Sequence, residues 1–74
     1  MHAEQIKDIL TAALPDCTVE VTGNGAKFHV KARGIAFKGL MPVKQQQLIY
    51  GFLNEHIQSG AIHAVTMDLG TENE

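Results

Sequence analysis

The apolar residues near the start of the chain recur with the spacing of a helix. They fall at relative positions i, i+3, i+4, i+7 and i+8, which places them on one stripe of a helical surface. These residues are Ile6, Ile9, Leu10, Ala13 and Leu14. Pro15 follows, and a proline biases the residue before it away from helical backbone angles. The pattern therefore predicts an amphipathic helix over residues 3–14.

Two further segments alternate between apolar and polar residues, as half-buried strands do. In the first, Cys17, Val19 and Val21 share one face, and Thr18, Glu20 and Thr22 share the other. In the second, Phe28, Val30 and Ala32 oppose Lys27, His29, Lys31 and Arg33. Between the segments stands Gly23-Asn24-Gly25, in which both residue types accept the positive φ that tight hairpin turns require. We expect a hairpin with one buried and one exposed face.

The second half of the chain predicts one more helix and one more strand. The helix is expected from about Val43 to Gln58, and Gly60 suits the left-handed residue that ends it. Its expected inner stripe consists of Val43, Ile49, Tyr50, Leu53 and Ile57. The last strand is expected over 62–69, with Val65, Met67 and Leu69 on its inward face. We expect the acidic tail, residues 70–74, to be frayed.

The order of these elements is helix, strand, strand, helix, strand. A hairpin followed by a helical crossover gives a three-stranded mixed sheet with both helices packed on one face. The chain has 74 residues, which leaves room for one hydrophobic core. We therefore predict a single α+β domain over residues 1–74.

Composition and charge narrow the classes of function. The net charge is -2 and only 5% of residues are aromatic, which counts against a dedicated nucleic-acid binder. No apolar run approaches the roughly 20 residues that span a bilayer, and the first residues lack the pattern of a secretion signal. Cys17 is the single cysteine, so no internal disulfide can form. We expect a cytoplasmic protein.

His63 is the first candidate for chemistry. It comes just after the Gly60 turn, so its ring is expected near one end of the sheet, beside the end of the second helix. Counting along the strand places it on the inward face with Val65 and Met67. One interpretation is a partly buried histidine that is hydrogen-bonded to a helix-end carbonyl. The other is a metal ligand, for which this chain offers no complete set of partners.

The basic residues of the second strand are the other candidates. Lys27, His29, Lys31 and Arg33 form either the solvated face of the sheet or a surface for phosphate or an acidic partner. Lys44 opens the second helix, followed by Gln45, Gln46 and Gln47. This first turn is expected either to be solvated or to form a docking surface. Cys17 is expected to face inward as a small apolar side chain. No carboxylate pair or nucleophile with a base is apparent, so we do not expect an enzyme.

Four short motifs together resemble the BolA family. They are Phe37-Lys38-Gly39, the run from Val43 to Tyr50, Glu55-His56-Ile57 and Ile62-His63-Ala64-Val65. The resemblance implies a class II KH-like fold and a monothiol glutaredoxin carrying glutathione as the partner. It also implies a shared [2Fe-2S] cluster, or an apo complex, in iron–sulfur trafficking and iron regulation. The family's C-terminal histidine matches His63, which would then be a cluster ligand in the complex.

The chain departs from the family pattern in one respect. Many members carry a second His or Cys ligand in the loop between the first two strands, whereas residues 23–27 contain neither. His29 is the nearest candidate for this second ligand. If it does not serve, the cluster would be labile, another donor would complete it, or the complex would contain no cluster. The KH-like resemblance suggests a rival function, nucleic-acid binding by a transcriptional regulator. Its candidate contacts are Lys27, Lys31, Arg33 and Lys44, although the GxxG loop of KH domains is absent.

Overall fold

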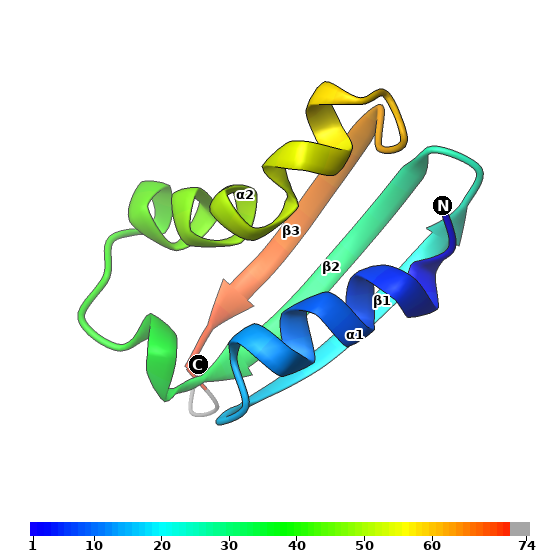
Figure 1. The fold of residues 1–74 in the computed structure, drawn as a ribbon. Coiled ribbons are helices and arrows are strands. Elements are labelled where there is room, and N and C mark those ends of the chain that lie inside the picture. Colours follow the sequence, from blue (N-terminus) through cyan, green and yellow to red (C-terminus); the bar gives the residue numbers. More distant parts are fainter. Residues whose placement is uncertain (72–74) are drawn as a thin grey trace.

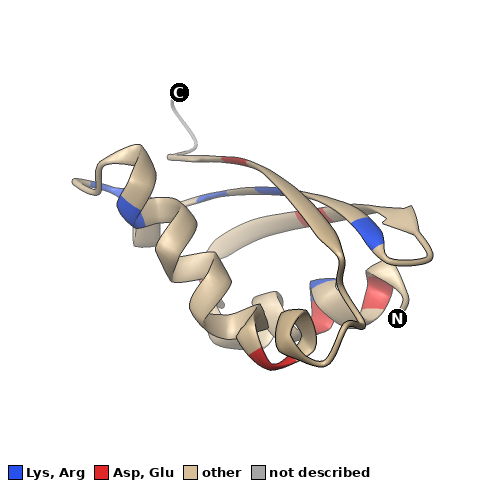
Figure 2. Ribbon diagram, turned by 90° about the horizontal axis from the view of Figure 1, so that it is seen from above, with Lys and Arg blue, Asp and Glu red and all other residues tan. Residues whose placement is uncertain are grey.

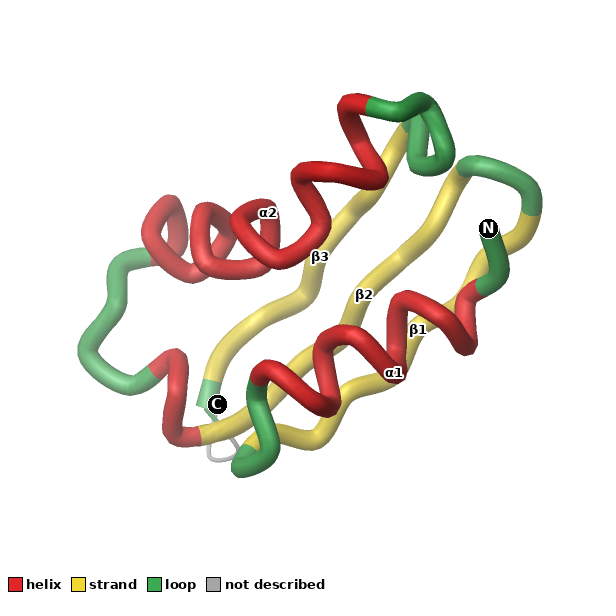
Figure 3. Tube along the Cα trace, in the orientation of Figure 1, coloured by secondary structure: helices red, strands yellow, loops and turns green. Residues whose placement is uncertain are grey.

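The computed structural model describes residues 1–71, which form two α-helices, a short 3-10 helix and three strands. The elements are α1 (Ala3–Ala13), β1 (Cys17–Asn24), β2 (Lys27–Gly34), η1 (Ile35–Phe37), α2 (Pro42–Gln58) and β3 (Ala64–Gly70). Within the sheet the order is β1-β2-β3, with β1 antiparallel and β3 parallel to β2. Both helices lie on the same face of the sheet (Figures 1 and 3). The predicted fold is confirmed.

The hydrophobic core lies between the helices and the inner face of the sheet. It consists of Ile6, Leu10, Leu14, Val19, Phe28, Val30, Ala32, Phe37, Ile49, Leu53 and Ile62. The central strand β2 contributes the most deeply buried strand residues, because it has a neighbour on each side and helices above it. The alternation predicted for β1 and β2 is confirmed, and Cys17 packs half-buried against this core.

The inner stripes of the two helices differ in part from those predicted. Ala13 is exposed at the end of α1, and Val43 and Tyr50 are 55% and 41% exposed on α2. The buried line of α2 runs instead through Gln45, Ile49 and Leu53, which are spaced one turn apart. The prediction went wrong because it took apolar residues as the inner face, whereas a buried glutamine occupies the first turn of that face.

The hairpin turn lies one residue later than predicted. Asn24 is the last residue of β1 and pairs with Lys27, so the two central residues of the turn are Gly25 and Ala26. Gly25 has φ of 64°, and no residue other than glycine within residues 1–71 has positive φ. The prediction that Asn24 would adopt positive φ is therefore wrong. A two-residue turn needs that conformation at its first position, and Gly25 provides it.

The last strand is also shifted relative to the prediction. β3 begins at Ala64, so His63 precedes the strand, and its side chain is exposed rather than inward. The alternation of side chains between the two faces of a strand does not hold in the bend that joins α2 to β3, so counting back from Val65 gave the wrong direction for His63. Gly70 ends β3 and is buried, which contradicts the expected fraying at that residue. Residues 72–74 of the predicted tail lie outside the described residues.

Candidate functional site

His63 is held at the end of the sheet where α2, the β1–β2 turn and β3 meet. Its backbone N–H donates to the Ala26 carbonyl at 2.8 Å, and the N–H of Ala64 donates to the same oxygen at 3.1 Å. The neighbouring Ile62 is buried, and its N–H donates to the His56 carbonyl of α2 at 3.0 Å. The backbone of His63 is therefore fixed against two other elements, while its side chain faces solvent.

The His63 ring lies beside the end of α2, as predicted. Its Nε2 atom is 4.0 Å from the position that a Cβ would take on Gly60. Gly60 itself has φ of 84°, the left-handed conformation expected of a residue that ends a helix. No hydrogen bond to the ring is present among residues 1–71, so the interpretation as a histidine bonded to a helix-end carbonyl does not hold. Both ring nitrogens are available to a ligand.

The β1–β2 turn lies directly next to His63, through the Ala26 carbonyl. This is the loop in which the family resemblance places a second ligand, and residues 23–27 offer none. His29 stands three residues beyond Ala26, which corresponds to about 10 Å along a strand. Its Nδ1 lies 2.7 Å from the Thr66 hydroxyl oxygen on the exposed face of the sheet. The structure therefore does not bring His29 and His63 together.

Cys17 is distant from His63. It pairs with Gly34 at the far end of β2, whereas His63 adjoins the turn at the beginning of that strand. A strand of 8 residues is about 25 Å long. The Cys17 sulfur is packed so closely over Gly34 that a Cβ on that glycine would lie 2.5 Å from it. This thiol has a packing role and is not near the candidate site.

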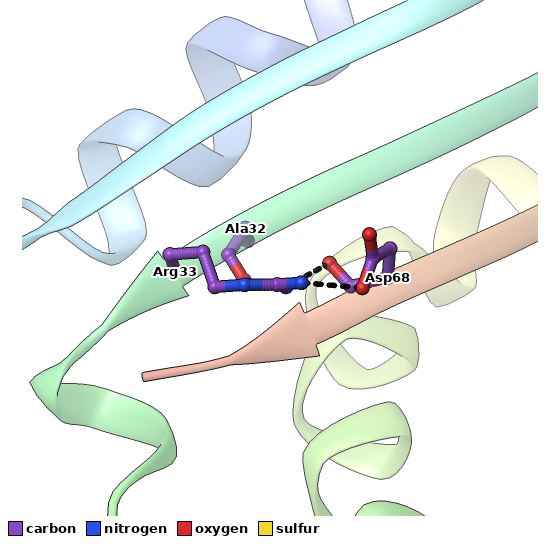
Figure 4. Close-up of polar contacts among 3 residues, drawn as sticks. All are labelled: Ala32, Arg33 and Asp68. Atoms are coloured by element: carbon purple, nitrogen blue, oxygen red, sulfur yellow. Dashed lines mark hydrogen bonds and ion pairs between the residues drawn. The ribbon is translucent and has the colours of Figure 1, made fainter. Parts of the chain in front are cut away.

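Two acidic side chains from the neighbouring strands lie among the basic side chains of β2 on the exposed face of the sheet. Lys31 stands in register between Glu20 of β1 and Asp68 of β3. Arg33 donates to the Asp68 carboxylate at 2.6 Å and to its carbonyl oxygen at 2.8 Å (Figure 4). The hydrogen bond from Arg33, and then the positive charges of Arg33, Lys31 and His29, hold the pKa of Asp68 below its ordinary value.

Lys44 lies on a different side of the molecule from the other nucleic-acid candidates. It belongs to the first turn of α2, which covers the inner face of the sheet, whereas Lys27, Lys31 and Arg33 project from the outer face. Figure 2 shows the separation of the basic positions between the start of α2 and the sheet. The structure therefore does not gather these four residues on one surface.

Gln45 is the one buried polar side chain found among residues 1–71, and the sequence analysis placed it in a solvated turn. Its Nε2 donates to the carbonyl oxygens of Phe37 at 3.2 Å and Leu40 at 3.1 Å. It thereby fixes the segment between η1 and α2. Gln45 lies four residues before Ile49 and eight before Leu53, and this helical spacing could have predicted that it shares their buried face.

Within residues 1–71, no three His, Cys, Asp or Glu side chains lie close enough to hold a metal ion. None of the helices in that range is long and apolar enough to cross a membrane. What the site offers is one exposed imidazole on a fixed backbone, beside an exposed turn. Such a group can act as a single ligand, and a metal centre that used it would need its remaining ligands from another molecule.

The fold and this site define a small α+β protein of class II KH-like topology with an exposed histidine at the end of its sheet. A model of the family described as "BolA-like protein" matches residues 2–74. The chain belongs to the BolA family. It is 40% identical to the acid stress protein IbaG of Escherichia coli K12, over 100% of this chain and 88% of that protein.

Solved structures agree with this assignment. A BolA homologue from Coxiella burnetii superposes with a TM-score of 0.84 at 26% identity, covering 99% of this chain and 94% of that one. The BolA domain of SufE1 from Arabidopsis thaliana superposes with a TM-score of 0.86 at 25% identity, covering 96% and 92%. The fold is therefore shared across bacteria and plants.

Proposed function

We propose that this protein is a non-enzymatic partner of a monothiol glutaredoxin. In the complex, His63 supplies one ligand to a [2Fe-2S] cluster whose other ligands come from the glutaredoxin and its glutathione. The role is the handling of iron–sulfur clusters and iron regulation. Membership of the BolA family supports this proposal, as does the resemblance of the motif around His63 to the family's cluster-binding histidine.

One observation carries the proposal: the His63 ring is exposed and free of hydrogen bonds among the described residues, on a backbone fixed by Ala26. A rigid backbone benefits a metal ligand, because pre-organised donors lose less entropy on binding. The residues present fit a cluster that is completed by a second protein, since this chain contributes one donor and no closed site.

When bound, the cluster supplies an iron–sulfur centre whose reduction potential imidazole ligation raises relative to thiolate ligation. His63 would hold one iron through its imidazole. The β1–β2 turn, which is exposed and contains no competing ligand, leaves space for the partner next to the ring. His29 is not carried into this proposal, because it is about 10 Å along the strand and its Nδ1 is engaged with Thr66.

The test is anaerobic reconstitution with a glutathione-loaded monothiol glutaredoxin, followed by visible absorption and circular dichroism. We expect a heterodimer whose cluster spectrum differs from that of the glutaredoxin alone. His63→Ala should remove this difference, and the far-ultraviolet spectrum of the variant should be unchanged because the side chain is exposed.

His29→Ala is the matched control, because it removes another exposed imidazole from the same end of the sheet. We expect the heterodimer spectrum to survive this change. Loss of the spectrum in both variants would make His29 a second ligand. A heterodimer spectrum that persists in His63→Ala, or the absence of any complex with the unaltered protein, would contradict the proposal.

A further inference from the structure

The segment that joins the end of β2 to the first turn of α2, residues 35–44, has no part in the site around His63. It follows Gly34, the last residue of β2, whereas His63 adjoins the turn before that strand, so about 25 Å of strand separates the two regions. We propose that the exposed side of this connecting segment docks onto the surface of a lipid bilayer with anionic headgroups. This inference goes beyond the proposed function, because it needs neither iron nor a protein partner.

Apolar side chains are concentrated on the surface of the connecting segment. Met41 is 70% exposed, Ile35 67%, Val43 55% and Leu40 37%. These are four of the six large apolar residues that are exposed within residues 1–71. Single exposed apolar residues are common, but several that adjoin one another mark a surface that binds a membrane or another protein.

The backbone of the connecting segment is fixed to the body of the molecule. Phe37 is buried in the core, and its carbonyl oxygen accepts hydrogen bonds from the Gln45 side chain and from the N–H of Leu40. The Met41 carbonyl oxygen accepts from the N–H groups of Lys44 and Gln45 in the first turn of α2. The exposed apolar side chains therefore project from a pre-organised backbone, and docking would order little additional chain.

The charge of the connecting segment is complementary to an anionic surface. It contains two lysines, Lys38 and Lys44, and no Asp or Glu. Both lysines are exposed, and within residues 1–71 neither makes an ion pair. Figure 2 shows basic positions at this end of the molecule, around the start of α2. A lysine side chain can lay its methylene groups over apolar surface and extend its ammonium group to an anionic lipid headgroup.

The shape of this surface favours a bilayer over a protein partner. In Figures 1 and 3 the connecting segment extends beyond the end of the sheet and forms one extremity of the molecule. The neighbouring hollow is lined by the first turn of α2 and by β3, and Ile35, Met41 and Val43 stand outside it. Protein interfaces are depleted of lysine and are anchored by aromatic residues, whereas this surface has two lysines and no exposed aromatic side chain. A projecting apolar surface with lysines matches the boundary between headgroups and acyl chains.

Charge also counts against a second copy of this chain as the occupant. In a symmetric dimer the same surface of both copies is in contact. Lys38 and Lys44 would then lie opposite a surface that carries the same two lysines, and the connecting segment contains no acidic residue that could pair with them. Like charges that face each other across an interface weaken it.

The test is co-sedimentation with two kinds of vesicle, one of phosphatidylcholine alone and one of phosphatidylcholine mixed with phosphatidylserine. We expect binding to the anionic vesicles only, and we expect added salt to weaken it because salt screens the attraction. Met41→Ser should weaken binding about tenfold, as for the loss of roughly two buried methylene groups. The fold should survive, since residue 41 is the N-cap of α2, where serine is favoured. Tyr50→Ser, which removes an exposed side chain farther along α2, is the matched control and should bind normally.

A second pair of variants distinguishes the connecting segment from the basic row of β2. Lys38→Gln combined with Lys44→Gln should weaken binding about fivefold for each lysine removed. Lys27→Gln combined with Lys31→Gln removes the same charge from the outer face of the sheet and should have a smaller effect.

Three results would overturn the proposal: equal binding to both kinds of vesicle, equal loss of binding in the two double variants, or full binding by Met41→Ser. No binding to the anionic vesicles at low salt would overturn it in favour of a protein partner. Self-association that rises with protein concentration and is lost in Met41→Ser would assign the surface to a second copy instead.

Discussion

Gln45 shows how one polar side chain can organise a segment that has no regular structure. Phe37 ends η1 and Leu40 lies in the connection from η1 to α2, and the carbonyl oxygens of both accept hydrogen bonds from the Gln45 side chain. Buried carbonyl groups without partners cost free energy, and the two N–H groups of one amide satisfy both. An apolar residue of similar size would fill the space but leave the Leu40 oxygen without this donor, while the Phe37 oxygen would keep only the hydrogen bond from the N–H of Leu40.

Gln45→Ala should therefore lower the free energy of unfolding by about 1–3 kcal/mol, the usual cost of leaving buried polar groups unsatisfied. Gln47→Ala, on the exposed side of the same helix, should change it by less than about 0.5 kcal/mol. Urea denaturation of both variants provides the comparison. Equal stability of the two would mean that the bonds to Phe37 and Leu40 contribute nothing.

At the scale of the element, one glycine within α2 and one just after it have opposite effects on stability. Gly51 lies in the helix interior with open space around it, so nothing in the described structure requires a glycine there. Gly60 follows the helix with φ of 84°, a conformation that other residues adopt only at a cost. The turn at Gly60 also directs the chain toward His63, so it links the helix to the candidate site.

Gly51→Ala should raise the free energy of unfolding by about 0.5–1 kcal/mol, because alanine loses less backbone entropy in a helix. Gly60→Ala should lower it by about 1–2 kcal/mol, since the residue must keep a left-handed conformation. Thermal or urea unfolding measures both changes. A stabilising effect of Gly60→Ala would show that the turn readily adopts another conformation.

At the scale of the whole molecule, one ion pair in the sheet makes the stability of the fold depend on pH. The pair formed by Arg33 and Asp68 joins β2 to β3 and holds the pKa of Asp68 below its ordinary value. A carboxylate whose pKa is lower in the folded state than in the unfolded state stabilises the fold at pH values above its unfolded pKa. This contribution is lost as the pH falls through the folded pKa.

Asp68→Asn should consequently make the protein less stable at neutral pH, by a small amount because the carboxylate is exposed. The difference from the unaltered protein should shrink as the pH is lowered below 3.8, the ordinary pKa of the group. Urea midpoints measured from pH 7 to pH 2.5 give the comparison. A difference that is independent of pH would assign the effect to packing and not to charge.

Local patterns in the sequence were sufficient for the order and type of the two α-helices and the three strands, but they did not predict η1. In β1 and β2 every second side chain faces the core, so apolar residues alternate with polar ones along each strand. Gly60 could be predicted to end α2 because a residue in the left-handed conformation, usually glycine, commonly ends a helix. The motifs around His63 also pointed to the family, which the comparisons confirm. The roles of His63 and of the basic residues remain predictions, because they depend on groups outside this chain.

The sequence by itself determined the order of the two α-helices and three strands and the burial of the central strand, since both depend on short-range periodicity. Only the tertiary structure decided that Gln45 is buried, that Val43 and Tyr50 are exposed, and that His63 faces solvent next to the β1–β2 turn. Each of these depends on which distant carbonyl, strand or turn lies opposite the residue. A periodic pattern gives the direction of a side chain relative to its own element, but it does not specify what stands across from it.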